Sequence, residues 1–186
     1  MNGQFLTKEN RDTLQRMSFM KRFNNAVHIH DENVAEHSFY VAMYAYALCD
    51  ELRIGGVLRQ IIIEKALVHD VHESIVSDIP HNVKKMDADV EHFFESYEHH
   101  YNRKNFTQLE KTYNGLFAVD QGICDLVVTL ADVLSVRQYA ELEVSLGNKH
   151  FEEILEGANE RISECIRQLK IAKLTYIDDV ARLINS

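Results

Sequence analysis

Proline, glycine and tryptophan are scarce in this sequence. The 186-residue chain has one proline, seven glycines and no tryptophan, while 46% of its residues are hydrophobic. Sandwiches and barrels need many turns, which proline and glycine usually supply, so this composition disfavours an all-β fold. The length is typical of one domain that can bury a sizeable core. We therefore expect a single domain over residues 1–186.

Positive charge is also in short supply. The chain has 20 lysines and arginines against 29 aspartates and glutamates, a formal net charge of −9. Because DNA, RNA and anionic membranes repel such a protein, we expect no nucleic-acid polymer and no membrane among its partners. Any phosphate group that the protein handles must meet a few local cations instead.

The cysteines form no motif. Cys49, Cys124 and Cys165 lie far apart among apolar residues, and no CxxC is present, so buried reduced thiols are expected. The longest apolar run is too short to span a bilayer, and the first residues, MNGQFLTKENRD, resemble neither a signal peptide nor a transit peptide. We expect a cytoplasmic protein.

Apolar residues recur at helical spacing along most of the chain, which predicts an all-α protein. Asn33 is the expected N-cap of one long helix. A later helix carries aromatic residues from Phe93 to Tyr101, which we expect to face the core. The expected helices cover approximately residues 8–20, 33–52, 57–76, 83–101, a segment ending near 117, and then 121–146, 151–174 and 177–184.

Polar side chains at three places fall on helix faces that the apolar pattern assigns to the core. These are His37, the pair His69-Asp70, and Asp132. Each one alone is more commonly a hydrogen-bonded core residue or part of a solvated face. Burying a single carboxylate costs several kcal/mol or forces it to stay protonated. One divalent cation bound by all four side chains would explain why polar groups occupy all three core-facing places.

The donor set narrows the choice of ion. Two imidazoles and two carboxylates, with room for water, suit Mn²⁺, Co²⁺, Fe²⁺, Ni²⁺ or Zn²⁺ better than Ca²⁺. On a helical wheel Glu73 lies between His69 and Asp70, where a second carboxylate could orient a water molecule. No P-loop, GxGxxG or Ser-His-Asp order is present, so ATP-driven or covalent acyl chemistry has no support.

The order His, His-Asp, Asp on separate helices resembles the HD-domain superfamily of metal-dependent phosphohydrolases. The words ENVAEHS, HDVHESIVSDIPHNVK and ADVLSVRQYAELEVSLGN look like those of the YfbR-type 5′-deoxynucleotidases. The likeness runs from about residue 22 to residue 148. It implies an HD-domain helical bundle with a metal site in its interior.

The resemblance also assigns roles by position. It implies that His37, His69, Asp70 and Asp132 bind one divalent metal. It implies that Glu73 positions or activates water and that Asp78 is a second acid beside the scissile phosphate. Arg22 matches the arginine that orients the phosphate. The residues implied to contact substrate are Arg22, Phe23, His37, Asp70, Asp78, Ile79, Pro80, His81 and Asp132.

Two positions depart from the family pattern. Phe23 replaces a tryptophan that is associated with packing on the sugar and excluding a ribose 2′-hydroxyl, so the preference for deoxyribose stays open. The motif HDVHE also contains an additional histidine, His72, which could reach a second metal or face solvent.

The implied reaction is attack of a cation-activated water on a phosphate ester of a small deoxynucleotide. The favoured substrate is a deoxynucleoside 5′-monophosphate, giving deoxynucleoside and phosphate. The alternative is a dNTP triphosphohydrolase of the short phage type, acting on dATP or a related nucleotide and releasing tripolyphosphate. Such an enzyme could use Mg²⁺ and could bind the additional phosphates with lysines such as Lys84 and Lys85. Otherwise these two lysines look like a solvated pair. A third reading is a non-catalytic metal-stabilised scaffold or regulator. The resemblance also implies a homodimer or larger homo-oligomer.

Overall fold

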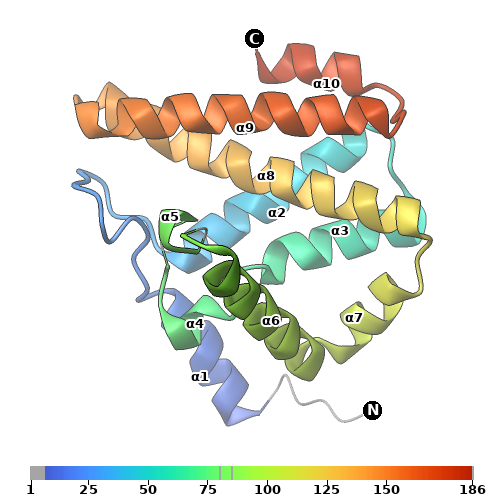
Figure 1. Cartoon of the computed structure of the whole chain (residues 1–186), viewed down its shortest axis with the longest axis horizontal. Helices are drawn as coiled ribbons and strands as arrows, with labels where there is room; N and C mark the ends of the chain where they lie inside the picture. The colour runs from blue at the N-terminus through green and yellow to red at the C-terminus, as the bar shows by residue number, and fades with distance from the viewer. Residues whose placement is uncertain (1–6, 80, 85, 186) are drawn as a thin grey trace.

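The computed structural model describes residues 7–79, 81–84 and 86–185, with the backbone alone for Glu9, His81 and Asn82. The described residues form helices and one isolated bridge between Lys21 and Asn33, which confirms the all-α fold (Figure 1). The helices are α1 (Lys8–Met17), α2 (Val34–Glu51), α3 (Gly56–Val68), α4 (Glu73–Val76), α5 (His81–Lys84), α6 (Ala88–Asn105), α7 (Thr107–Asn114), α8 (Ala118–Ser145), the short 3₁₀ turn η2 (Lys149–Phe151), α9 (Glu152–Ile171) and α10 (Ile177–Ile184).

The long helix α8 organises the core by packing against α2, α3 and α9 (Figure 1). Apolar side chains from these helices meet in one cluster, including Val41 of α2, Ile62 of α3 and Leu130 of α8, all fully buried. The three cysteines are buried free thiols, as the sequence predicted. No helix within the described ranges combines the length and apolar character that a bilayer crossing needs.

Helix α2 begins where the sequence predicts. The Asn33 side chain accepts a hydrogen bond from the Glu36 backbone N–H at 3.0 Å, and the Glu36 carboxylate accepts one from the Asn33 N–H at 3.1 Å. This reciprocal capping box satisfies two backbone donors that the first turn would otherwise leave unpaired. It therefore sets the register of the first turn, from which His37 points into the protein.

The predicted helix over 57–76 is wrong in its second half. Helix α3 ends at Val68, residues 69–72 form tight turns, and α4 covers only Glu73–Val76. Side chains compete for the backbone here: His69 Nδ1 lies 2.8 Å from the Ala66 carbonyl, and His72 Nδ1 lies 3.0 Å from the His69 carbonyl. Such local bonds offer the chain an alternative to a continuous helix. The helical-wheel angles of a regular helix thus do not describe His69, Asp70 and Glu73.

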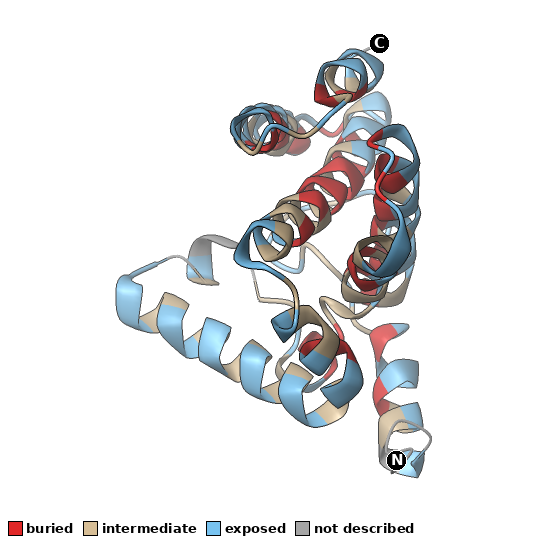
Figure 2. Ribbon diagram, turned by 90° about the vertical axis from the view of Figure 1, so that its right-hand side faces the viewer, coloured by how far each residue is buried: buried red, intermediate tan, exposed pale blue. Residues whose placement is uncertain are grey.

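The predicted aromatic core stripe on α6 is only partly present. No residue of α6 is buried, and Phe93 is 64% exposed. In Figure 2, α6 is the long, mostly pale blue helix set apart from the bundle at the lower left. Its closest helical contacts are with α5 and α7 rather than with the main core. Phe94, Tyr97 and Tyr101 are half-buried. Tyr97 packs against His72, and Tyr101 packs against Phe106, so the aromatic face is covered in part.

Candidate metal centre and substrate site

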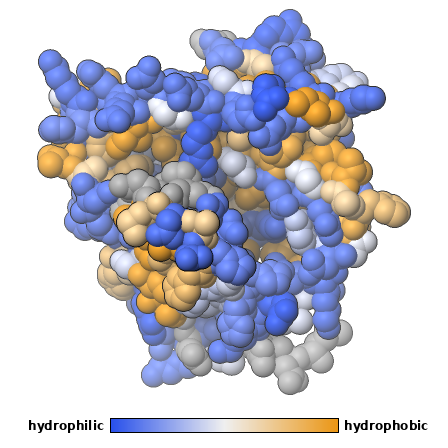
Figure 3. Space-filling view, viewed as in Figure 1, coloured by the Kyte–Doolittle hydropathy of each residue, from blue (hydrophilic) through white to orange (hydrophobic). Residues whose placement is uncertain are grey.

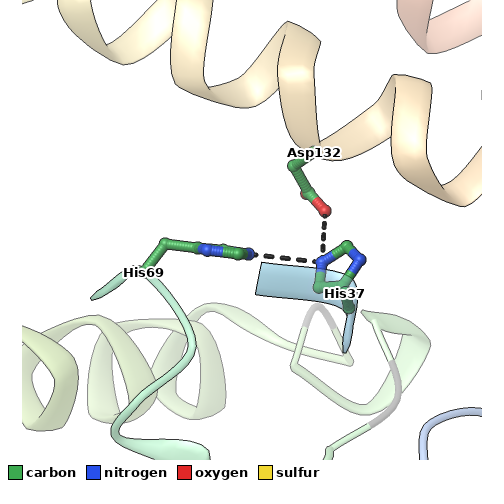
Figure 4. A group of neighbouring side chains, drawn as sticks. All are labelled: His37, His69 and Asp132. Atoms are coloured by element: carbon green, nitrogen blue, oxygen red, sulfur yellow. Dashed lines mark hydrogen bonds and ion pairs between the residues drawn. The ribbon is translucent and has the colours of Figure 1, made fainter. Parts of the chain in front are cut away.

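Three of the predicted ligands converge at the centre of the molecule. His37 comes from the first turn of α2, His69 follows the end of α3, and Asp132 lies in the middle of α8 (Figure 4). His37 Nε2 is 3.3 Å from His69 Nε2 and 3.1 Å from Asp132 Oδ1. All three ligand atoms lie within 4.8 Å of one another. Atoms that bind one ion at about 2.0–2.2 Å are separated by comparable distances, so this group could hold a metal.

Asp70 joins the group from the turn after α3. Its Oδ2 lies 3.1 Å from His69 Nε2 and 3.6 Å from His37 Nε2. Thus the structure brings the four predicted side chains together. His37 is fully buried, whereas 29% of the Asp132 side chain is exposed, so the group is open to solvent on its carboxylate side.

The two imidazoles are oriented by contacts on their far nitrogens. His69 Nδ1 lies against the Ala66 carbonyl, and His37 Nδ1 lies 3.1 Å from the hydroxyl of Ser135. A carbonyl can only accept, so His69 carries its proton on Nδ1 when neutral, and Nε2 offers a lone pair to the group. Ser135 was not among the site residues predicted from the sequence. It is buried one turn after Asp132, and its i+3 spacing on the same face was the signal available.

The four side chains of the group together carry a net negative charge at neutral pH. Burial would lower the pKa of His69, but the adjacent Asp70 charge and hydrogen bond, together with Asp132, raise it to about 9. Burial alone would raise the pKa of Asp132, yet the His37 hydrogen bond and the two histidine charges lower it to about 2. Burial and the Arg22 charge lower the pKa of His37 to about 4. At neutral pH without metal, one proton on His69 therefore sits between two ionised carboxylates, which leaves a negative site suited to a divalent cation.

Glu73 lies beside the group, with its side chain only 3% exposed. Its Oε1 accepts a hydrogen bond from Lys84 Nζ at 2.7 Å, whereas the buried Oε2 has no partner among the described residues. Burial and the charge of Asp70 raise the pKa of Glu73 to about 8, with Lys84 opposing. A buried carboxylate oxygen without a partner is costly unless a water or ligand meets it. The expectation that Lys84 is one of a solvated pair is wrong, because it neutralises this acid.

The segment after α1 brings Arg22 and Phe23 to the same region. Phe23 adopts a left-handed backbone conformation (φ 56°), and its N–H donates to Asp78 Oδ2 at 3.0 Å. Arg22 donates through Nη1 to the buried Glu32 carboxylate at 2.7 Å, while its buried Nε has no partner among the described residues. A bulky residue at positive φ is strained, so the hydrogen bond to Asp78 helps to hold the backbone of Phe23 in this conformation.

The remaining predicted positions are less fully described. Ile79 follows Asp78 and is partly buried. Pro80 lies outside the described residues, and the side chain of His81 does as well. His72 is 6% exposed, packs against Tyr97 and belongs to no metal-ligating group in the described part of the chain, so the option that it faces solvent is wrong.

A cavity of about 170 Å³ lies between α3, α6, α7 and α8, and His69 forms part of its wall. Lys65, Glu98 and Asp125 contribute charged groups to the lining. Figure 3 shows this face of the molecule as mostly hydrophilic, with apolar side chains visible in the hollow between the helices. The candidate metal group, formed by His37, His69, Asp70 and Asp132, is therefore bordered by a cavity on the side of His69.

This helical fold with a His/Asp cluster at its centre is that of the HD-domain phosphohydrolases. A cyanophage S-2L HD phosphohydrolase, bound to dA and one catalytic Zn²⁺ ion, superimposes with a TM-score of 0.69 at 15% identity, covering 94% of this chain and 95% of that one. A Pyrococcus horikoshii protein matches with the same TM-score, 0.69, at 23% identity, covering 96% of this chain and 98% of that one.

The sequence of the chain identifies its family within this fold. The chain belongs to the YfbR-like 5′-deoxynucleotidase family, whose sequence pattern matches residues 11–178. A 5′-deoxynucleotidase of Enterobacter sp. (strain 638) is 29% identical over 147 residues, 74% of each chain. One from Erwinia tasmaniensis is 27% identical over 176 residues, 90% of this chain and 87% of the relative. The resemblance drawn from the sequence words is thereby confirmed.

Proposed function

We propose that the protein hydrolyses deoxynucleoside 5′-monophosphates to deoxynucleosides and phosphate with the help of one divalent metal. Membership of the 5′-deoxynucleotidase family supports this activity. The observation that carries it is the convergence of His37, His69 and Asp132 beside a buried Glu73 oxygen that lacks a partner within the described residues. A purely structural cluster would have no need for that second acid.

The proposed metal ligands are His37, His69, Asp70 and Asp132. Two imidazole nitrogens and carboxylate oxygens suit Zn²⁺, Mn²⁺, Co²⁺, Fe²⁺ or Ni²⁺, and the phage relative named above holds Zn²⁺. When bound, such a cation lowers the pKa of water and offsets charge on phosphoryl oxygens. Ser135 and the Ala66 carbonyl keep both imidazoles facing the site.

The protein's own residues then bind the substrate and move protons. Arg22, whose Nε is unpaired within the described residues, feels the charges of Asp70 and Asp132, and we assign it to hold the phosphate. Glu73, in its ionised form, takes a proton from the attacking water. Asp78, whose pKa is raised by burial, supplies one to the departing 5′-oxygen.

The nucleoside would lie along a short strip of the chain next to these acids. We assign its contacts to Phe23, Ile79, Pro80 and His81. The Phe23 ring is held by Tyr139, stacked at 4.9 Å, and by the edge of Phe151 at 5.3 Å. It is thus a supported aromatic wall rather than a mobile surface residue.

The monophosphate is favoured over the triphosphate for a specific reason. Lys84 already pairs with Glu73 and is needed there. A β- or γ-phosphate that drew Lys84 away would leave a buried carboxylate unpaired, which is costly.

Product analysis tests the proposal. The purified protein should be assayed with dNMPs, NMPs and dNTPs in the presence of Co²⁺, Mn²⁺, Mg²⁺ or Zn²⁺, reading both phosphate and tripolyphosphate. We expect phosphate from dAMP or another dNMP. Tripolyphosphate from dATP would identify a triphosphohydrolase instead, and no product with any metal would favour the scaffold reading. Light scattering on the same samples tests the proposed homodimer or larger homo-oligomer.

Changing Phe23 to tryptophan should sharpen discrimination against ribonucleotides. The larger ring extends the wall supported by Tyr139 and Phe151, so a 2′-hydroxyl finds less room. We expect the ratio of kcat/KM for dAMP to that for AMP to rise by about three- to tenfold, the range of a single steric contact. Phe23→Leu, which removes the aromatic wall, should lower the same ratio. An unchanged ratio in both variants would remove residue 23 from the sugar pocket.

Metal binding should release a proton from His69. Below its pKa of about 9 in the metal-free protein, His69 is protonated, and a ligating imidazole must be neutral. Apparent metal affinity should therefore rise with pH, by about tenfold per unit between about pH 7 and 9. Calorimetric titration with Mn²⁺ in buffers of different ionisation enthalpy measures the protons released. A pH-independent affinity without proton release would contradict the assignment of His69.

A further inference from the structure

A second buried carboxylate, Glu143, lies near the end of α8. It is fully buried, and each of its hydrogen bonds from the described residues comes from a neutral N–H donor. The Ile29 N–H donates to Oε2 at 2.9 Å, and the His30 N–H donates to Oε1 at 2.6 Å. Asn148 Nδ2 donates to Oε2, also at 2.6 Å. Two consecutive backbone amides of a loop thus point at one side chain more than a hundred residues away in sequence.

Two neighbours of Glu143 hold the same loop. Asn148 Nδ2 also donates to the Val27 carbonyl at 2.8 Å. The Tyr139 hydroxyl, one turn before Glu143, donates to the His30 carbonyl. We call Tyr139, Glu143 and Asn148 the loop clamp. Together they bind backbone groups of residues 27–30, although most side chains of that stretch are exposed.

The clamped loop is the one that carries Arg22 and Phe23. Its base is closed by the Arg22 N–H, which donates to the Glu32 carbonyl at 2.9 Å. Its first turn is closed by the Ala26 N–H, which donates to the Phe23 carbonyl at 2.9 Å. Tyr139 contributes twice, because its ring stacks on Phe23 while its hydroxyl binds the loop tip. One face of α8 therefore holds both the loop and the side chain that the loop presents.

The chemistry of the clamp is unusual for a device that only adds stability. A buried charge is costly, and apolar packing of equal volume is often as stable. A carboxylate, however, accepts several directional hydrogen bonds at once, and two adjacent amides fix the orientation of the backbone between them. Glu143 uses both oxygens, so glutamine cannot replace it fully, because its NH₂ group would face an N–H donor.

We propose that Glu143, supported by Asn148 and Tyr139, is a positioning residue that fixes the 22–32 loop so that Arg22 and Phe23 meet the substrate. This inference rests on the proposed nucleotidase function. Glu143 touches neither the metal group nor the reacting atoms. It acts on substrate affinity and sugar selectivity through the loop, whereas the metal ligands and Glu73 stay in place.

Glu143→Gln tests this role, with Glu141→Gln as the matched control. Glu141 lies on the same helix but is exposed and pairs with Arg137 at the surface. For Glu143→Gln we expect KM for dAMP to rise about tenfold, as for the loss of one hydrogen bond to a charged group. The dAMP-to-AMP ratio of kcat/KM should fall by about three- to tenfold. Bound metal and kcat should stay close to those of the wild type, and the control should match the wild type throughout.

A merely structural role predicts a different result. A lower kcat with unchanged KM and unchanged sugar selectivity would overturn the proposal, as would wild-type kinetics. Glu143→Asp, which keeps the charge with a shorter reach, should recover part of the lost affinity. If Glu143→Gln does not fold, Asn148→Ser removes the Val27 contact and should shift KM and selectivity in the same direction.

Hydrogen exchange separates this inference from the proposed function. The Ile29 and His30 amides should exchange faster in Glu143→Gln than in Glu141→Gln, whatever the substrate is. Unchanged exchange at these amides refutes the clamp. A second outcome is that the exchange rates of the two variants differ as expected while the wild type hydrolyses no nucleotide. This would refute the proposed function but not the contact between Glu143 and the loop. The positioning role would also be overturned, because Arg22 and Phe23 would have no substrate to bind.

Discussion

Asp132→Ala should remove both the bound metal and nearly all phosphate release. Asp132 supplies the only carboxylate from α8 in the group of three, and its Oδ1 lies 3.1 Å from His37 Nε2. Without it, two imidazoles and Asp70 remain, and the site loses one of its two negative charges. We expect kcat/KM for dAMP to fall at least about a thousandfold, beyond the 10- to 100-fold typical of outer-shell changes around a metal.

Thermal stability provides an independent measure of this loss. A metal that binds only the folded state stabilises it, by about 2.7 kcal/mol at a free concentration a hundredfold above Kd. The wild-type Tm should therefore rise on adding Zn²⁺ or Mn²⁺, and that of Asp132→Ala should not. Elemental analysis of the purified proteins measures bound metal directly. The exposed Glu141→Ala variant on the same helix should behave as the wild type. Full activity or full metal content in Asp132→Ala would refute the proposed centre.

Glu73→Gln should separate metal binding from turnover. Glutamine keeps the shape of the side chain and can still accept the hydrogen bond from Lys84, but it cannot take up a proton from water. Because Glu73 lies outside the group of ligand atoms, metal content and KM should change little. We expect kcat to fall by about 10²- to 10⁴-fold, the usual contribution of a general base.

The control for this variant is Glu64→Gln, the same change at an α3 carboxylate that accepts a hydrogen bond from Gln60. It should leave kcat and metal content unchanged. Lost metal in Glu73→Gln would make Glu73 a ligand. An undiminished kcat would remove it from proton transfer altogether and would leave Asp78 as the acid to test.

Several features of the site could be read from residue types and spacing. His37, Asp132 and the pair His69-Asp70 stood out because polar groups fell on apolar helix faces, and the structure brings their side chains together. The Asn33 cap was predictable because a capping box is local, requiring only residues three apart. The helix over 177–184 was likewise set by its own apolar pattern, and α10 has these bounds.

Other features were not predictable because they depend on contacts between distant segments. Lys84 was expected at the surface, but it meets Glu73 eleven residues earlier because the chain turns back between them. The aromatic residues of α6 have helical spacing, yet spacing cannot say whether a second helix covers them. Glu143 looked like one more polar residue on a long helix, since its partners, Ile29 and His30, precede it by more than a hundred residues.

The sequence by itself determined the helical class, the donor types of the candidate metal group and the family, because periodicity, side-chain chemistry and short sequence motifs are properties of the chain alone. Tertiary structure alone decided which polar groups are buried away from solvent. Burial, rather than residue type, raises the pKa of Glu73, and the approach of two carboxylates keeps the proton on His69. Folding likewise placed the 22–32 loop on α8, because a buried carboxylate finds its hydrogen-bond donors only when distant segments are packed together.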